Sequence, residues 1–269
     1  MIALDAQELL QEICHYTDTS EKNRVGEEIA LSPELAGMKM FDAPVEGLAR
    51  ADDELFAKLR SDEVVWSEYR LPREWLPGAM TVVSFFFPQG EVPRVTNRAQ
   101  REEPSYAWLH SRIEGQQFIN SAAEYACRLL NDAGYEAVAP SVDPGFKTGK
   151  FRSNWSERHT AFICDLGTFG LSKGFITDEK GMAGRFMSIV TTAEFDVPAR
   201  RPRGLYDNCV RCHACVRRCP AGAISPETGK DHAKCAAYMS ETCRKYTPRY
   251  GCGKCQTGVP CEFRCPKKK

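Results

Sequence analysis

The first 200 residues combine two kinds of hydrophobic spacing. Near the start, the apolar residues of DAQELLQEICHY recur every three or four positions, which predicts an amphipathic helix. The later run MTVVSFFF is β-branched and aromatic throughout and is followed by Pro88, which predicts a buried strand. The pattern therefore predicts helices and strands that share one core.

Later segments continue this mixture. A long helix is expected from Pro104 to Asn131, with Gly134 as its C-cap. Strands are expected at YEAVAPS and from Gly184 to Phe195, and SNWSERHTAFICDLG predicts a helix that begins at a Ser or Asn cap. Because these elements lack a regular βαβ rhythm, we expect an α+β fold.

Charge divides the chain near residue 200. Residues 1–200 carry 21 Lys and Arg against 31 Asp and Glu, whereas residues 201–269 carry 15 against 5. The segment VPARRPRG, from Val197 to Gly204, has the prolines and glycine of a linker. We therefore expect a core domain over residues 1–200 and a smaller domain over residues 201–269.

Several classes of protein do not fit the sequence. No run approaches the roughly 18 apolar residues of a membrane span, and the N-terminus lacks the basic region of a signal peptide. Neither GFKTGKF nor GTFGLSKG has the spacing of a nucleotide-binding loop. We expect a cytoplasmic protein without a membrane partner. The basic C-terminal segment leaves nucleic acid as a less favoured partner.

Cysteine is concentrated in the basic segment. Ten of the thirteen cysteines fall in the last 69 residues. The first four form the run C-x2-C-x2-C-x3-C-P, from Cys209 to Pro220, which is typical of bacterial ferredoxins. Disulfides would need an oxidising compartment, and zinc sites usually use two separated CxxC pairs. The spacing therefore favours iron–sulfur clusters over zinc or disulfides.

Two clusters are expected, because the cysteine before the proline in such a run ligates the other cluster. Three residues, Cys209, Cys212 and Cys215, would wrap one cluster, and Cys219 would bind the second. Eight thiolates are needed, and the remaining ligands come from Cys235, Cys252, Cys255, Cys261 and Cys265. Spacing alone leaves open which of these five is spare.

The segments CVRCHACVRRCPAGAI, KCAAYM and YGCGKC resemble the dicluster domain of epoxyqueuosine reductases and reductive dehalogenases. The stretch ERHTAFICDLGTFGLSKGFIT is similar to the helix, glycine turn and strand that precede that domain. The resemblance covers roughly residues 137–266. It implies a nitroreductase-like core that binds cobalamin, and a ferredoxin-like domain whose two 4Fe–4S clusters deliver low-potential electrons.

The resemblance also implies a ligand set. Cys209, Cys212, Cys215 and a cysteine near the end would hold one cluster, and we favour Cys261 over Cys265 for that last place. The other cluster would be held by Cys219, Cys235, Cys252 and Cys255.

Further site residues follow from the same resemblance. Gly167, Gly170, Ser172 and Lys173, in the glycine turn, are candidate contacts to a cofactor, because a missing Cβ lets the backbone approach a flat ligand closely. Asp143 is the candidate proton donor. The ordinary roles of these residues are a tight turn, a solvated lysine and a turn-forming aspartate.

The sequence also departs from that family. Epoxyqueuosine reductases continue into helical repeats, whereas this sequence ends at Lys269, and Gly170 is followed by Leu171 where the family has lysine. We therefore expect a divergent iron–sulfur oxidoreductase with a different substrate, supplied by a ferredoxin-type or flavin-type donor and acting on a small molecule or corrinoid. The alternative is a non-catalytic electron carrier that serves a partner enzyme.

Overall fold

The computed structural model describes residues 4–267. Its α-helices are α1 (Ala6–Thr19), α2 (Glu54–Lys58), α3 (Pro72–Trp75), α4 (Glu91–Ala99), α5 (Tyr106–Asp132), α6 (Glu157–Ile163), α7 (Ala214–Arg217) and α8 (His232–Tyr246). Three short 3₁₀ helices, η1 (Glu21–Asn23), η2 (Glu27–Ile29) and η3 (Pro33–Leu35), follow α1.

The longer strands belong to one sheet: β1 (Val45–Arg50), β2 (Thr81–Pro88), β8 (Gly184–Thr191) and the short β3 (Ala137–Val138). Two-residue or three-residue strands form three separate hairpins, β4 (Thr148–Gly149) with β5 (Arg152–Ser153), β6 (Gly167–Phe169) with β7 (Phe175–Thr177), and β9 (Ile224–Ser225) with β10 (Gly229–Lys230).

The central sheet has the order β1-β2-β8-β3, and every neighbouring pair is antiparallel. β2 lies between β1 and β8, and all eight of its residues are buried. Because both faces of β2 are covered, its sequence is continuously apolar rather than alternating. The register pairs Val83 with Ile189 and Phe85 with Met187, so these four side chains share one face.

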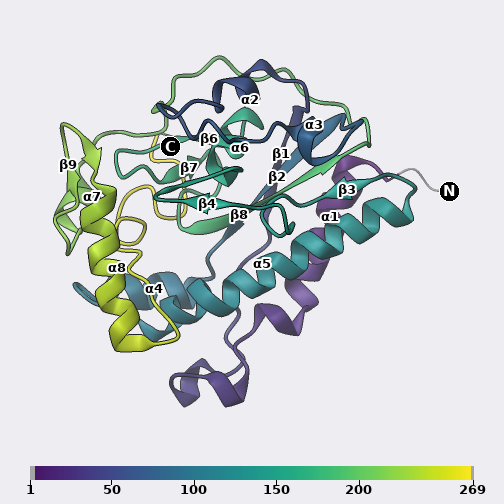
Figure 1. Cartoon of the computed structure of the whole chain (residues 1–269). Helices are drawn as coiled ribbons and strands as arrows, with labels where there is room; N and C mark the ends of the chain where they lie inside the picture. Colours follow the sequence, from purple (N-terminus) through teal and green to yellow (C-terminus); the bar gives the residue numbers. More distant parts are fainter. Residues whose placement is uncertain (1–3, 268–269) are drawn as a thin grey trace.

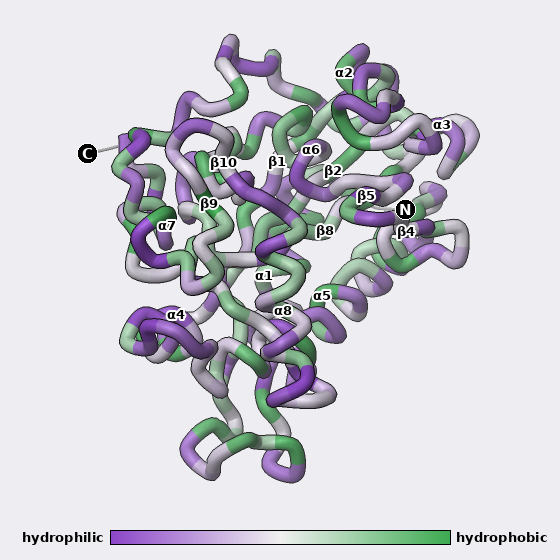
Figure 2. The backbone as a smooth tube through the Cα atoms, turned by 60° about the vertical axis from the view of Figure 1, so that its left-hand side comes forward, coloured by the Kyte–Doolittle hydropathy of each residue, from purple (hydrophilic) through white to green (hydrophobic). Residues whose placement is uncertain are grey.

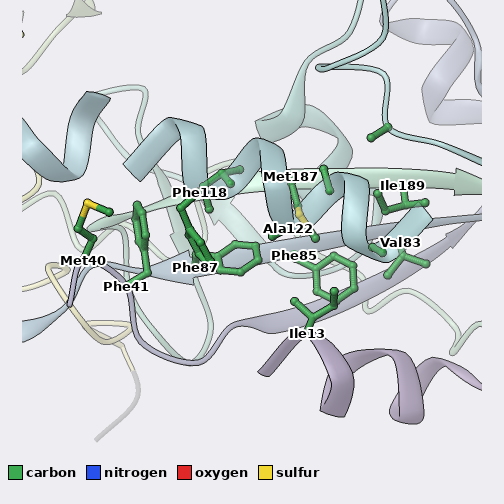
Figure 3. Close-up of a cluster of buried hydrophobic side chains, with 14 of the residues drawn as sticks. Ile13, Met40, Phe41, Val83, Phe85, Phe87, Phe118, Ala122, Met187 and Ile189 are labelled. Atoms are coloured by element: carbon green, nitrogen blue, oxygen red, sulfur yellow. The ribbon is translucent and has the colours of Figure 1, made fainter. Parts of the chain in front are cut away.

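The long helix α5 and the N-terminal helix α1 cover that face (Figure 1). Asp5 caps α1 through a reciprocal capping box with Glu8, and the helix buries Leu9 and Ile13. Figure 3 shows Ile13 close to Phe85, and Phe118 of α5 beside Phe87. This cluster is the larger of the apolar cores.

The opposite face of the sheet carries α2, α3 and α6. Trp155, which is fully buried, stacks on Phe56 and Tyr69, and its indole N–H donates to the hydroxyl of Ser188 on β8. This contact fixes the start of α6 over the middle of the sheet, beside the cavity described below.

The cysteine-rich segment packs directly on the core. α7 and α8 gather with α4 at one end of the molecule in Figure 1, and Figure 2 turns this side toward the viewer. Arg203 forms ion pairs with Asp165 and Asp178, and Asn208 donates to the carbonyl of Ile176. The C-terminal segment is therefore held by the core at several places after residue 200.

The α+β class is confirmed, and the helices over Ala6–Thr19 and Tyr106–Asp132 lie where the hydrophobic pattern predicts them. Gly134 follows α5 with φ of +91°, as expected of a C-cap glycine. Three predictions were too long. The strand expected from Gly184 to Phe195 ends at Thr191. Only Ala137–Val138 of YEAVAPS pairs as strand, and α6 covers only Glu157–Ile163, because the preceding residues extend along the β4–β5 hairpin. No described helix is long and apolar enough to cross a membrane.

Candidate metal centre and ligand cavity

Four cysteines line a narrow cavity between the C-terminal segment and the β6–β7 hairpin. Cys209, Cys212 and Cys215 come from the evenly spaced triplet, and Cys261 comes from the last loop. Besides burial, the charges of the three triplet thiols raise the pKa of Cys261, so all four cysteines lie close together. Four thiolates around one small space match the donor set of a 4Fe–4S cluster.

A second set of four cysteines lines a much larger cavity of about 590 Å³. Cys219 follows α7, Cys235 lies in the first turn of α8, and Cys252 and Cys255 lie in the loop after α8. The backbone N–H of Ala223 donates to the Cys219 sulfur over 3.2 Å, a contact that lowers the electron density on a thiolate ligand. Besides burial, the charge of Cys255 raises the pKa of Cys215, so the two sets of four cysteines are adjacent.

Helix α4 of the core positions the loop that carries Cys252 and Cys255. The fully buried amide of Asn97 donates to the Cys252 carbonyl over 3.0 Å and to the Thr257 hydroxyl over 3.1 Å. The buried ammonium of Lys254 donates to both the carbonyl and the amide oxygen of Asn97. Because each of these polar groups has a partner, the loop has one preferred position against α4.

A buried carboxylate holds the next stretch of the same loop. Glu262, only 2% exposed, accepts two hydrogen bonds from Arg98, at 3.1 and 2.7 Å, and lies 3.6 Å from Arg94. It also accepts the backbone N–H of Gly258. A bidentate guanidinium contact is among the strongest that a carboxylate makes, so α4 fixes the loop that carries Cys261.

The two remaining C-terminal cysteines lie outside both cavities. Cys265 is buried and Cys243 lies on α8, and neither lines a cavity. Burial raises the pKa of Cys252 and of Cys261 to about 12, so each thiol must give up its proton to bind a metal. Within residues 4–267, no three His, Cys, Asp or Glu side chains converge closely enough to hold a single metal ion.

The wall of the large cavity opposite the cysteines comes from the core. It includes Glu157 at the start of α6, Arg112 of α5 and Arg185 of β8. Four buried polar atoms on this wall have no hydrogen-bond partner in the described residues: Gln89 Oε1, Arg112 Nε, Glu157 Oε1 and Arg185 Nε. Because buried polar groups are normally paired, this wall is suited to a polar ligand.

Comparisons with known proteins support this interpretation. Residues 205–225 match the family described as "4Fe-4S binding domain", which confirms the prediction of 4Fe–4S binding. An epoxyqueuosine reductase of Bacillus cereus is 29% identical over 124 residues, which cover 42% of this chain and 30% of that protein. The chain is therefore similar to epoxyqueuosine reductases over this stretch and carries a 4Fe–4S binding segment.

Solved structures agree on the fold. The epoxyqueuosine reductase of Streptococcus thermophilus superposes with a TM-score of 0.52 at 14% identity, covering 96% of this chain and 66% of that one. A catabolic reductive dehalogenase superposes with a TM-score of 0.51 at 18% identity, covering 97% of this chain and 37% of that one. The matched stretch thus spans less than a third of the Bacillus cereus relative and less than two thirds of these solved chains.

The predicted glycine-turn residues are not among those that line the large cavity, although Gly174 of the same turn is. Gly170 and Ser172 line the narrow cavity, and Lys173 lines a third cavity together with Cys209. A Cβ at Gly167 would lie 2.1 Å from the carbonyl oxygen of Ile176, so the close pairing of β6 with β7 requires that glycine. A contact between these residues and a second cofactor stays a prediction.

Asp143 also lies outside the residues that line either cavity. Its Oδ1 accepts the backbone N–H of Gly145 over 2.7 Å, which is the contact of a turn-forming aspartate. The prediction that Asp143 donates a proton is not tested by this arrangement.

Sequence reasoning did not single out Glu157, Arg112 or Arg185 as site residues. Burial raises the pKa of Glu157 to about 7, although the Ser188 hydroxyl hydrogen-bonds to it. None of the three lies in a recognisable motif, since they come from α6, α5 and β8. Only their meeting on one cavity wall identifies them.

Proposed function

We propose that the protein is an iron–sulfur oxidoreductase of the epoxyqueuosine reductase type, in which two 4Fe–4S clusters pass electrons to a ligand in the 590 Å³ cavity. Cys209, Cys212, Cys215 and Cys261 would hold the first cluster, and Cys219, Cys235, Cys252 and Cys255 the second. One observation carries the proposal. The second cysteine quartet and the polar wall of the core face the same cavity.

Electrons would arrive at the first cluster. Cys212 is the one exposed cysteine of the described residues, and the apolar side chains of Tyr206 and Val210 beside it are also exposed. An apolar patch beside a redox centre suits a protein donor of the ferredoxin or flavin type. The second quartet, adjacent to the first, would then relay the electrons to the cavity.

Cobalamin is the cofactor that we propose for this cavity. The side chains of Gln89, Arg112 and Arg185 line it, hold buried polar atoms without partners, and would offer hydrogen bonds to the amide groups around a corrin ring. When bound, cobalamin would supply a low-potential cobalt centre that accepts the electrons of the second cluster. The protein's own contribution would be orientation of the ligands and a proton.

Glu157 is the residue that we propose as the source of that proton. It is the one acidic residue on the wall of the large cavity, and its raised pKa keeps a substantial protonated fraction near neutral pH. Ser188 donates to Oε2, which leaves the unpartnered Oε1 as the atom that carries the proton. Asp143, the earlier candidate, accepts a backbone hydrogen bond in a turn instead.

Anaerobic reconstitution of the full chain with iron, sulfide and cobalamin tests the proposal. We expect about eight iron and eight sulfide per chain, together with retained corrinoid visible in the absorption spectrum. Reduction of an epoxide in epoxyqueuosine-containing tRNA, and of the free nucleoside, would then be measured by mass spectrometry. Two clusters without corrinoid or turnover would favour the electron carrier, and zinc without sulfide would overturn the proposal.

A further inference from the structure

Three guanidinium groups from three different elements meet on the wall of the large cavity. Arg112 comes from α5, Arg158 from α6 and Arg185 from β8. Burial and the charges of Arg112 and Arg158 lower the pKa of Arg185 to about 9. Desolvation and the charge of Arg112 lower the pKa of Arg158, whereas the Cys255 and Cys235 thiols oppose that shift. The three positive charges are therefore close enough to repel one another.

No carboxylate compensates these charges. Among residues 4–267, none of the three arginines forms an ion pair with Asp or Glu. Their hydrogen bonds go to neutral acceptors, which are the Tyr250 hydroxyl, the Gln116 side chain and the backbone carbonyls of Arg112 and Lys173. No Asp or Glu therefore pairs with the guanidinium groups, and the negative charge nearest to Arg158 comes from the Cys235 and Cys255 thiols of the same cavity.

The arginines also keep donors to spare. The Nε atoms of Arg112 and Arg185 are buried and have no partner in the described residues. Lys230 and Lys254, from the C-terminal segment, add positive charge to the cavity, and Glu157 is the only acidic residue among those that line it. Since burial raises the pKa of Glu157, even this carboxyl carries less than a full negative charge near neutral pH.

Arg112 and Arg185 are partly buried and Arg158 is exposed beside them, and like charges that are partly desolvated cost free energy unless an anion offsets them. A guanidinium group offers paired donors that match the oxygens of a phosphoryl group, and a phosphoryl group has enough oxygens to meet several arginines at once. We propose that the cavity binds its ligand through a phosphoryl group held by Arg112, Arg158 and Arg185. This rests on the proposed ligand cavity and narrows the ligand to phosphate esters.

The phosphoryl group has two possible sources. It belongs either to the substrate, as a phosphate ester, or to the nucleotide phosphodiester of a bound corrinoid. A neutral corrin amide would accept hydrogen bonds from the arginines without offsetting their charge, so it does not by itself explain the cluster of three.

The test uses the full chain after anaerobic cluster reconstitution, without any reductant. Inorganic phosphate is titrated by calorimetry at constant ionic strength, with chloride and acetate as comparison anions. The variants are Arg185→Gln and Arg158→Gln, the second of which makes only one of the described hydrogen bonds. Arg101→Gln, an exposed arginine outside the cavity, is the matched control.

We expect phosphate to bind the wild type and the Arg101→Gln control equally, and each cavity variant at least tenfold more weakly. Cluster absorbance and melting temperature show whether a variant has folded. Equal binding of acetate and phosphate, or unchanged phosphate affinity in a folded Arg158→Gln variant, would overturn the proposal. Because no electron transfer is measured, the result is independent of whether the oxidoreductase proposal holds.

Competition identifies the source. Cobalamin and a corrinoid that lacks the nucleotide phosphodiester are each titrated in the presence and absence of phosphate. If phosphate displaces only cobalamin, the cofactor supplies the phosphoryl group. If phosphate and cobalamin bind together, the substrate supplies it.

Discussion

The Ser188 hydroxyl on β8 donates a 2.7 Å hydrogen bond to Oε2 of Glu157 on α6, while Oε1 of the same carboxyl has no partner in the described residues. The Trp155 indole N–H donates to the same hydroxyl from its other side. One oxygen of Glu157 is therefore fixed, and the other is buried without a partner in a residue that lines the cavity. The proposed proton donor is thus held in one orientation by β8.

The raised pKa of Glu157 makes stability depend on pH. In the unfolded chain the carboxyl titrates near 4.5, and in the folded protein near 7, so the folded state binds more protons between these values. The contribution of Glu157 to the free energy of unfolding is therefore highest below pH 4.5 and falls as the pH rises to 7. Relative to Glu157→Gln, the wild type should lose up to about 3 kcal/mol across this range, less where cavity water solvates the carboxylate.

Denaturant unfolding at pH 5 and pH 8 measures this difference. Glu124→Gln, an exposed residue on α5, is the control and should show the same stability difference from the wild type at both pH values. If the gap between wild type and Glu157→Gln does not change with pH, Glu157 does not exchange a proton in this range.

The choice between Cys261 and Cys265 is testable with matched substitutions. Cys261 lines the narrow cavity and Cys265 does not. We expect Cys261→Ala to lose about half of the iron and sulfide, since one of two cubanes would lack a ligand. Cys265→Ala should retain both clusters. Iron analysis of anaerobic samples measures the cluster content of both variants. Loss of iron in Cys265→Ala but not in Cys261→Ala would assign Cys265 as the ligand.

Removal of the Glu262 carboxylate should loosen the loop that carries Cys261. Glu262→Gln weakens the paired contact with Arg98 and the contact with Gly258, and we expect a loss of about 2 kcal/mol, because hydrogen bonds to a buried carboxylate lose their charge. The control is Asp18→Asn, which breaks an exposed pair with Lys39 and should cost less than about 1 kcal/mol. Urea midpoints and cluster bleaching rates measure both, and equal effects would show that Glu262 has no special role.

A substitution at Val210 tests the proposal that a protein donor docks beside the first cluster. A Val210→Glu substitution puts a charge on the exposed apolar patch beside Cys212, so the KM for reduced ferredoxin should rise roughly fivefold or more. Cluster reduction by dithionite should stay unchanged, because a small reductant needs no docking surface. Val64→Glu, equally exposed but in another part of the chain, serves as the control. An unchanged KM would place the donor elsewhere.

Local patterns predicted much of the molecule. The helix at Ala6–Thr19, the buried strand at Thr81–Pro88 and the 4Fe–4S binding of the cysteine run follow from short-range spacing. A turn of helix, a strand face and a short ligand loop each involve residues that are near neighbours in the chain. The order of residue types along the chain is therefore enough to predict these elements and the cluster-binding loop.

The large cavity could not be predicted in this way, because its walls come from segments that are far apart in the sequence. Arg112, Glu157 and Arg185 span 73 positions of the chain and share no motif, yet the packing of α5, α6 and β8 brings them to one wall. The cysteine spacing left Cys261 and Cys265 as alternative ligands. In the folded chain Cys261 lines the narrow cavity with the triplet, and the contact of Glu262 with Arg98 of α4 holds this loop in place. The sequence by itself determined which chemistry the thiols favour. The tertiary structure decided what surrounds them, because burial and charge at a site depend on residues that only folding brings together.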